Sequence, residues 1–407
     1  MRNRQSLSFL ALLLLPAVTT AAHALTPVGA PLAIVDGAPC SVIADLEVIS
    51  TPKGAVEVVW VDGPGFDVKG QRFGRDLVAT DAPVSLLPLH GGLNVVHPVG
   101  TWTGRYELAL NVLDFGEDPA DPKAAYRLSL DLDGNPVGEP ARFETKNFLQ
   151  IAPAGGGDAL QLRVEPPYYG RASCRSRGIL ASRIDPGGSP ISVESRLTKR
   201  ASGWAGADLE VARQPNDTFV AAYATCDQFV GVVARRLNAT GAPVGKPINL
   251  PFPGRVADYY GSGGLALAAK GNDLAVAAMA LSPPAGPTAG YTRAVVNGKI
   301  LGVNRIPTPA GFAGVSGVVD LEPSPTGSGY LLLFQAAGSD RFKLFAQALD
   351  AQGVPQGVPV ALTEDGERGL TGAIASLPDG RWLVVIRSQS GLSDACTESL
   401  VGTVLGE

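Results

Sequence analysis

The sequence repeats one unit seven times, and this repeat limits the fold more than any other feature. In each unit an apolar strand leads into a turn of Gly, Asn or Asp, and the next strand opens with a large apolar residue. The seven opening residues are Val56, Tyr106, Leu160, Phe219, Leu274, Tyr330 and Trp382, at spacings of 50, 54, 59, 55, 56 and 52 residues. Such a period is typical of arrays in which each unit buries a face against the next.

A second hairpin follows in each unit and brings the count to four strands. Its clearest copies, residues 233–248 and 344–360, have an alternating strand, a turn with Asn or Asp and Gly, and a strand that contains Pro. An edge strand tolerates Pro because its outer side has no partner to bond. Four strands at this period predict a β-propeller blade, with strand a innermost and strands b, c and d outward. The 50 Gly and 33 Pro argue against long helices.

The two ends of the chain indicate how the array closes. The seventh unit stops at residues 398–406, before its fourth strand, whereas residues 26–34 match the fourth-strand pattern of residues 243–248. We therefore predict an all-β fold: a seven-bladed β-propeller of four-stranded antiparallel blades, closed by an N-terminal strand at about 26–36 in the last blade. The expected single domain is 25–407, with blades near 41–92, 93–147, 148–205, 206–261, 262–313, 314–370 and 371–407.

These motifs resemble a known group of repeats. A Pro-Asp-Gly turn before an aromatic strand (378–382) and a Leu-Asp-x-x-Gly-x-Pro-x-Gly hairpin (349–357) are similar to the degenerate propeller repeats of exported bacterial proteins of unassigned function. The resemblance covers nearly the whole mature chain, although the third and fifth units match weakly. It implies the fold and no particular chemistry, since propellers support enzymes, lectins and docking platforms alike.

The first 24 residues have the pattern of a secretory signal peptide. Arg2 and Arg4 precede an apolar stretch at 7–18, and small residues end at Ala24, where we expect cleavage. A retained anchor helix is the alternative, but the stretch is short for a membrane span. We expect a periplasmic or secreted monomer without a membrane span. The formal charge of −5 gives no electrostatic footprint for nucleic acid.

Four cysteines in an exported chain favour disulfides over a metal site. Three pairings are possible. The repeat alignment places Cys174, Cys226 and Cys396 between strands b and c, and Cys40 just after the N-terminal strand. These connections share one face of a propeller, so we predict the disulfides Cys174–Cys226 and Cys40–Cys396. A zinc site is the weaker alternative, because no Cys has a Cys or His close by in sequence.

Acidic residues recur on the predicted innermost strands. Only His90 and His97 follow the predicted signal peptide, too few histidines to favour a Ser-His-Asp triad or a His-rich metal site. We therefore assign no catalytic residue, metal or cofactor. A ring of carboxylates at the channel mouth could bind a cation or raise one carboxyl pKa for acid–base chemistry. The simpler interpretation is a polar channel lining. In the second unit His97 takes the Glu position, and the sixth unit is displaced by one residue. The acids are Asp45, Glu47, Asp208, Glu210, Asp320 and Glu322.

Aromatic residues gather in the predicted loops of blades 3 to 5, on one face. Tyr and Trp suit stacking on sugar rings or anchoring a protein partner. We therefore favour an exported, non-catalytic binding or interaction protein that recognises a glycan or a protein surface. The alternative is a carboxylate-based glycoside hydrolase or lyase acting at the channel mouth, and packing of the loops over the blades is the simplest explanation of the aromatic cluster. The candidate ligand-binding residues are Tyr168, Tyr169, Trp204, Asp258, Tyr259 and Tyr260.

Overall fold

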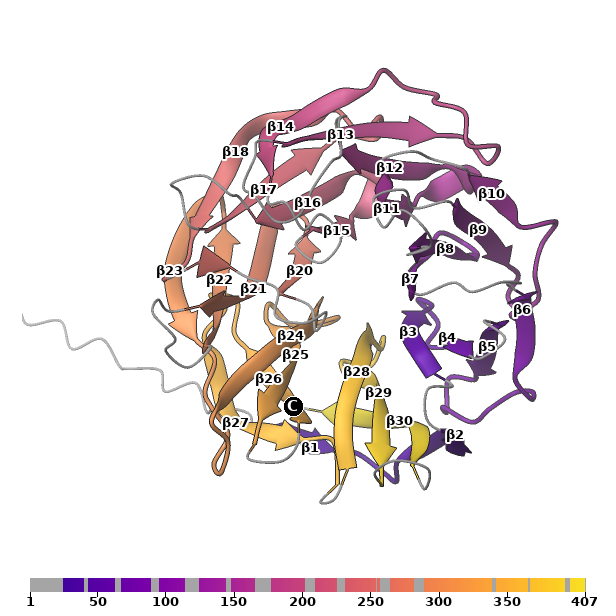
Figure 1. The fold of residues 1–407 in the computed structure, drawn as a ribbon, viewed down its shortest axis with the longest axis vertical. Helices are drawn as coiled ribbons and strands as arrows, with labels where there is room; N and C mark the ends of the chain where they lie inside the picture. Colours follow the sequence, from indigo (N-terminus) through magenta and orange to yellow (C-terminus); the bar gives the residue numbers. More distant parts are fainter. Residues whose placement is uncertain are drawn as a thin grey trace, which may run out of the picture.

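The protein forms seven antiparallel sheets arranged in a ring, and one edge strand of each sheet lies next to the ring axis (Figure 1). The fold class predicted from the repeat is confirmed. The computed structural model describes residues 25–39, 43–62, 67–88, 95–113, 124–143, 148–164, 177–201, 209–224, 231–253, 255–256, 264–281, 289–338, 342–364, 367–391 and 396–406.

The first four blades each contain four strands, ordered from the ring axis outward. Blade 1 has β3 (Ile43–Ser50), β4 (Val56–Asp62), β5 (Asp67–Phe73) and β6 (Val84–Pro88). Blade 2 has β7 (Val95–Trp102), β8 (Tyr106–Leu113), β9 (Ala124–Leu130) and β10 (Ala141–Phe143). Blade 3 has β11 (Phe148–Pro153), β12 (Ala159–Val164), β13 (Arg177–Ile184) and β14 (Ser195–Ala201). Blade 4 has β15 (Leu209–Arg213), β16 (Phe219–Ala224), β17 (Gly231–Leu237) and β18 (Pro243–Pro251).

The last three blades keep this order, with two interruptions. In blade 5 the innermost strand is split into β19 (Arg255–Val256) and β20 (Leu265–Lys270), followed by β21 (Asp273–Leu281), β22 (Ala289–Val296) and β23 (Lys299–Arg305). Blade 6 has β24 (Gly314–Pro323), β25 (Tyr330–Ala337), β26 (Phe342–Leu349) and β27 (Pro355–Ala361). Blade 7 has β28 (Glu367–Ser376), β29 (Trp382–Ser390) and β30 (Thr397–Gly406), and its outer strand consists of β1 (Thr26–Pro27) and β2 (Leu32–Pro39).

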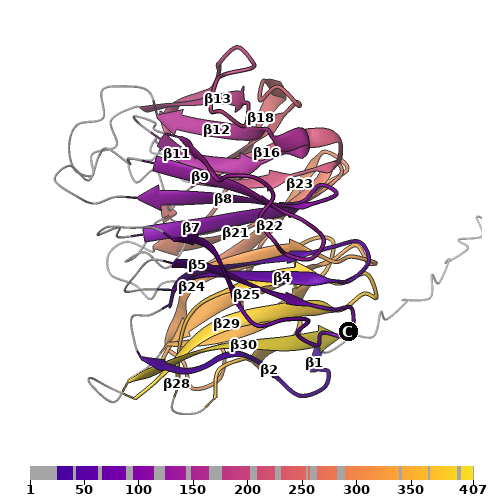
Figure 2. The ribbon, with the colours of Figure 1, turned by 90° about the vertical axis from the view of Figure 1, so that its right-hand side faces the viewer.

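The N-terminal strand closes the ring, as the sequence predicted. β1 and β2 both run antiparallel to β30, with Thr26 opposite Gly406 and Ala33 opposite Val401 (Figure 2). The Val28 amide donates to the Val404 carbonyl at 2.8 Å. The first and last described segments of the chain therefore share one sheet, which leaves β30 with a partner on both sides.

Each interface between neighbouring blades has its own apolar core. Successive side chains of a strand point to opposite faces of its sheet, so the first residue of strand b faces the preceding blade and the second faces the following one. Phe219, for example, packs with Leu160 and Leu162 of blade 3. Leu160 itself faces blade 4, and the residue of blade 3 that faces blade 2 is the small Ala159. The structural equivalent of Val56 and Tyr106 in the third unit is thus Ala159 rather than Leu160.

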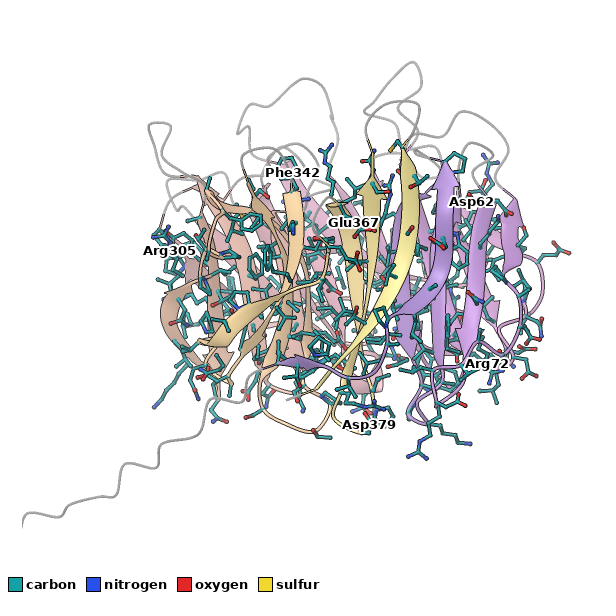
Figure 3. All side chains as sticks on the ribbon, turned by 90° about the horizontal axis from the view of Figure 1, so that it is seen from below. Asp62, Arg72, Arg305, Phe342, Glu367 and Asp379 are labelled. Atoms are coloured by element: carbon teal, nitrogen blue, oxygen red, sulfur yellow. The ribbon has the colours of Figure 1, made fainter. Side chains whose placement is uncertain are left out.

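The two ends of the blades differ. Hairpin turns between strands a and b and between strands c and d lie at one end, which we call the turn face. The b–c and d–a connections lie at the other end, which we call the loop face. Asp379 and Arg72 mark the turn face in Figure 3, and Asp62, Glu367 and Phe342 mark the loop face. None of the helices in the described segments is long and apolar enough to cross a membrane.

The recurring Asp or Asn of the c–d hairpins has a defined local role. Asp131 Oδ1 accepts the backbone N–H groups of Asp133 and Asn135 at 2.8 and 2.9 Å. Asp350 and Asn238 accept the equivalent pairs of N–H groups in blades 6 and 4. These side chains stabilise the turn by replacing backbone acceptors. The repeated sequence motif is therefore explained by turn geometry.

Candidate functional site

The acids on the innermost strands can be compared by their level along the ring axis. We define this level by the position, counted along strand b, of the residue that pairs with each acid. Glu47 pairs with Val59 and Glu210 pairs with Ala222, which are the fourth residues of β4 and β16. These two carboxylates lie at the same level, as their spacing predicted. Asp320 pairs with Leu333, the fourth residue of β25, so it takes the level of Glu47 and Glu210.

The sixth blade is displaced by two residues, not by the single residue predicted. Ser50 pairs with Val56 in blade 1 and Pro323 pairs with Tyr330 in blade 6, so the a–b turn is one residue longer in blade 6. The extra turn residue adds to the difference of one in the sequence spacing. Glu322 therefore lies two residues nearer the turn face than Glu47 and Glu210.

The prediction that His97 takes the Glu position in the second unit is wrong. His97 pairs with Asn111, the sixth residue of β8, whereas Val99 pairs with Ala109 at the level of Glu47. The cause is the short a–b turn of blade 2, in which Trp102 pairs directly with Tyr106 across three residues. In blade 2 the apolar Val99 therefore occupies the level at which blades 1 and 4 have Glu47 and Glu210.

Asp320 uses both carboxylate oxygens to hold backbone. Its Oδ1 accepts the N–H of Leu321 at 2.7 Å, and its Oδ2 accepts the N–H of Ile374 on β28 at 2.7 Å. Asp45 makes the first of these contacts in blade 1, accepting the Leu46 N–H at 2.9 Å. Asp320 thus links blade 6 to blade 7. Because both of its carboxylate oxygens already accept backbone N–H groups, Asp320 is poorly placed to accept a proton from a ligand.

Glu322 is a candidate acid whose pKa is raised by its surroundings. Burial first, and the Asp320 carboxylate second, raise the pKa of Glu322 to about 8. Ser376 Oγ lies 2.6 Å from the Pro323 carbonyl and 3.3 Å from Glu322 Oε1. A serine hydroxyl has a single hydrogen, which suits the nearer carbonyl, so the longer contact is completed when Glu322 keeps its own proton. Glu322 can therefore act as a neutral acid near pH 7.

The surroundings of the remaining candidate acids are described in part. Glu47 packs toward β7 of blade 2, where its Cγ would lie 3.1 Å from a Cβ placed on Gly100. Asp208 lies outside the described residues, as does His90. In the part of the chain that the structure describes, no three His, Cys, Asp or Glu side chains are grouped so that they could hold a metal ion.

The predicted aromatic residues all lie outside the described residues, as does Asp258. The described strand ends that flank them lie on the loop face of blades 3 to 5. These ends are Val164 and Arg177 in blade 3, Ala201 and Leu209 between blades 3 and 4, and Val256 and Leu265 along the innermost position of blade 5. The grouping of Tyr168, Tyr169, Trp204, Tyr259 and Tyr260 stays a prediction.

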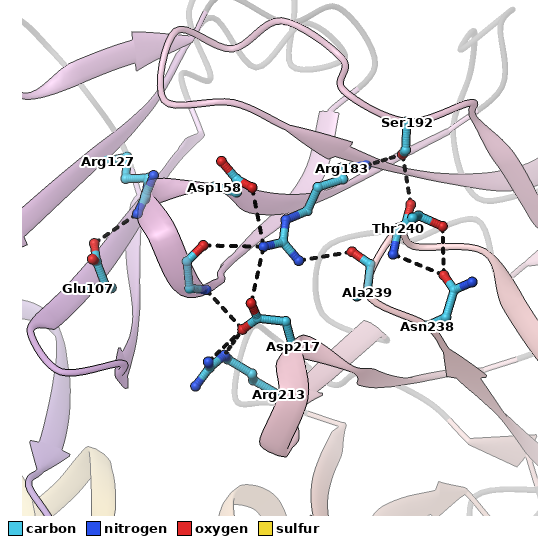
Figure 4. Close-up of polar contacts among 11 residues, drawn as sticks. Glu107, Arg127, Asp158, Arg183, Ser192, Arg213, Asp217, Asn238, Ala239 and Thr240 are labelled. Carbon is cyan, nitrogen blue, oxygen red and sulfur yellow. Dashed lines mark hydrogen bonds and ion pairs between the residues drawn. The ribbon is translucent and has the colours of Figure 1, made fainter.

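A polar network that the sequence did not reveal joins blades 3 and 4 at the turn face (Figure 4). Arg183 donates to the carbonyls of Ala239 at 3.0 Å and Gly155 at 3.3 Å. Asp217 Oδ1 accepts Arg213 Nη2 at 2.6 Å and the Gly155 N–H at 3.0 Å. Burial tends to raise the pKa of Asp217, but the bonds from Arg213 and Gly155 outweigh it and lower that pKa. These charges are engaged in holding the two blades together.

Further contacts extend this network around the turn face. Polar side chains of one blade bond to backbone carbonyls of a neighbouring blade, which fixes the a–b turns relative to one another. The donors and acceptors are Gln214 to Gly271, Lys270 to Ser324 and Gly327, and Ser376 to Pro323. These bonds link the a–b turns of blades 4 to 7 to one another.

One cavity lies at the seam where the ring closes. It measures about 340 Å³ and lies between β2 and blade 1, away from the acids near the ring axis. An ion pair between Lys69 and Asp62 lies at its wall. Its lining residues are Ile34, Val35, Ala38, Trp60, Asp62, Lys69 and Pro83. Sequence reasoning missed it, because its walls come from segments that meet only on closure.

Cys396 is the one cysteine among the described residues, and it is 7% exposed. Cys40, Cys174 and Cys226 lie outside them. Ala38 is opposite Glu398 and Pro39 is opposite Thr397, and these are the described residues nearest to Cys40 and Cys396 in the sequence. Directly opposed residues of antiparallel strands have Cα atoms about 4.5 to 5.5 Å apart, within the range that a disulfide spans.

We expect peptide mapping of the unreduced, alkylated protein to find Cys40 linked to Cys396 and Cys174 linked to Cys226. The control is the same digest after reduction, in which both linked peptides should separate. Recovery of Cys40 alkylated, or linked to Cys174 or Cys226, would contradict the predicted pairing.

Comparisons with known proteins bear on the fold alone. No family model matches this sequence, and no curated protein matches it. Among solved structures, a Pyrococcus horikoshii acylaminoacyl peptidase is similar at 9% identity and a TM-score of 0.47, over 85% of this chain and 50% of the peptidase. Kluyveromyces lactis Hsv2 is similar at 11% identity and 0.47, over 90% and 98% of the two chains. A variant of the Streptococcus pneumoniae NanB sialidase is similar at 10% identity and 0.49, over 94% and 71%.

The chain spans about half the length of the acylaminoacyl peptidases that it resembles. The seven-blade architecture of this protein is established by its own strand pairing.

Proposed function

We propose that this protein is an exported, non-catalytic binding protein whose ligand docks on the loop face of blades 3 to 5. The ligand class is a glycan or a protein surface, and the binding groups are Tyr168, Tyr169, Trp204, Asp258, Tyr259 and Tyr260. We further propose that the mature protein begins after Ala24 and acts as a monomer in the periplasm or outside the cell.

The observation that carries this proposal is the contrast between the two faces. Polar side chains of the turn face bond to neighbouring blades, as Arg183 and Lys270 do. The described strand ends that flank the candidate aromatic residues lie at the loop face of blades 3 to 5. Loops on a rigid scaffold commonly carry the binding residues of a protein, and clustered Tyr and Trp side chains supply contact area with a polar tip.

A glycan-array screen of the mature protein tests this function. We expect binding that the double variant Tyr169→Ala, Tyr260→Ala loses by at least tenfold, since stacked aromatic side chains are binding hot spots worth about 2 kcal/mol or more. Arg105→Ala, an exposed position in an a–b turn, is the matched control and should bind normally. Equal binding by the double variant would place the site elsewhere, and binding by neither protein would leave a protein partner as the ligand to test.

Glu322 favours the second candidate, a carboxylate-based glycoside hydrolase or lyase. A general acid must keep its proton near the working pH, and the pKa of Glu322 is about 8. The partner acid is the weak point, because Asp320 already accepts two backbone N–H groups. The test is release of nitrophenol from a panel of nitrophenyl glycosides. Release by the parent protein that the Glu322→Gln variant loses would support the enzyme function. Absence of turnover by the parent protein across that panel would count against it.

A further inference from the structure

Glu57 is a buried acid at the contact between blades 1 and 2. It is the second residue of β4, faces blade 2 and is 1% exposed. Its counterpart in blade 2, Glu107, is fully partnered, accepting Arg127 Nη2 at 2.8 Å and Ser129 Oγ at 2.6 Å. In the other five blades the equivalent residues are apolar: Leu160, Val220, Ala275, Leu331 and Leu383. Glu57 therefore breaks the pattern without the compensation that Glu107 has.

The Glu57 carboxyl is enclosed by backbone from both blades. A Cβ placed on Gly70 of β5 would lie 2.5 Å from Glu57 Oε1, and one placed on Gly134 in the c–d turn of blade 2 would lie 2.9 Å from Oε2. Among the described residues, Oε2 has no hydrogen-bond partner. An added side chain would fit at neither glycine, so the acid fills the space between the two blades.

The charged groups around Glu57 do not neutralise it. Arg72 on β5 is the nearby cation, but its Nη1 donates to Asp133 Oδ1 at 2.7 Å. Asp131, in the same turn of blade 2, adds a negative charge. The Tyr106 hydroxyl on β8 interacts electrostatically with Glu57 and Arg72. The pKa of Tyr106 is raised to about 12, and burial is the largest cause. Glu57 thus lies near one cation that already bonds to Asp133, one carboxylate and a neutral phenol.

An ionised carboxylate is unfavourable in this setting. Burying a charge without a matching partner costs far more than burying a neutral polar group. Burial raises the pKa of Glu57 to about 8, Arg72 lowers it and Asp131 raises it. The folded protein therefore holds this proton more tightly than the unfolded chain, in which the ordinary value is 4.5.

We propose that Glu57 is a proton-controlled latch between blades 1 and 2, closed while the carboxyl is neutral and loosened when it ionises. Between pH 4.5 and 8 the folded state binds more protons at this group than the unfolded state, so the stability that it contributes falls as pH rises. The latch is therefore tightest below about pH 4.5, weakens as the pH rises through neutrality, and is fully loosened above about pH 8.

Hydrogen exchange of the mature protein at pH 6 and pH 9.5, corrected for the intrinsic pH dependence of exchange, tests the latch. We expect the opening equilibrium of peptides from β4 and β8 to rise by up to about 100-fold at the higher pH, because the effect accumulates only between pH 6 and the pKa of about 8. Peptides from the contact between blades 5 and 6 should change much less. Glu57→Gln, which keeps the shape and stays neutral, should abolish the local rise.

Glu322→Gln is the matched control, since it removes an acid of similarly raised pKa between blades 6 and 7 and should leave the rise at β4 and β8 intact. The same rise in Glu57→Gln as in the parent would overturn the proposal. A flat profile of the parent protein at β4 and β8 would overturn it as well, and that measurement requires no variant to fold.

Discussion

Replacing Arg127 by Ala should destabilise the protein by about 3 to 5 kcal/mol, because it leaves the Glu107 carboxylate buried without its cation. The two side chains are 4% and 5% exposed and lie 2.8 Å apart. Urea unfolding at pH 7 measures the change. Arg381→Ala is the control: its partner Asp379 is 43% exposed, so this change should cost at most about 1 kcal/mol. Equal effects of the two substitutions would contradict this account.

The pair matters because the contact between blades 2 and 3 has little apolar material in the described residues. Its cluster consists of Ala109, Ile151, Ala159 and Ile184, with Ala141 at the edge. Replacing both charges together, as Glu107→Leu with Arg127→Met, should recover most of the stability lost by Arg127→Ala, since a well-packed apolar pair often equals a buried ion pair. A double variant that is less stable than Arg127→Ala would contradict this expectation. It would show that the ion pair stabilises the fold by more than the two charges neutralising each other.

Deleting residues 25–39 should cost about 5 kcal/mol or more and cause aggregation. The deletion removes Leu25, which is 6% exposed, and Leu32, Ile34 and Val35, which pack against the core between blades 7 and 1. A fully buried aliphatic side chain contributes about 1.5 to 3 kcal/mol, and the bare β30 edge becomes available for pairing between molecules. Thermal unfolding and size-exclusion chromatography measure both effects.

Addition of a synthetic peptide of residues 25–39 to the truncated protein provides the control. We expect the peptide to restore part of the melting temperature and to suppress aggregation, because it can re-pair with β30. A truncated protein that melts with the parent would show that the N-terminal strand is not needed for ring closure.

The repeat could be predicted from sequence because its signals are local. The Asp or Asn of each c–d turn bonds its own turn, and the alternation along strands b and c reports burial directly. The missing fourth strand of the last blade identified the closing strand for the same reason.

The levels of the acids could not be predicted as well, because turn length changes the register. Three residues in the a–b turn of blade 2 move His97 away from the level of Glu47, and six residues in blade 6 bring Asp320 to it. Sequence spacing alone does not separate turn residues from strand residues. A strand-pairing alignment anchored on the last residue of strand a would have done so.

Contacts between blades were missed because their partners are distant in sequence. Arg183 and Asp217 are 34 residues apart, and no local pattern joins them. The sequence did contain a signal for Glu57 and Glu107, because each is a charged residue with apolar neighbours on both sides in a largely apolar strand. Such residues are rarely buried without a functional or structural reason.

Ring closure by the N-terminal strand is the central claim, and hydrogen exchange of the intact mature protein tests it most directly. The amides of residues 26–39 that face β30, including that of Val28, should be protected on the timescale of the 397–406 peptides. Complete exchange of residues 26–39 at the shortest labelling time, as in a free chain terminus, would contradict closure of the ring by this strand.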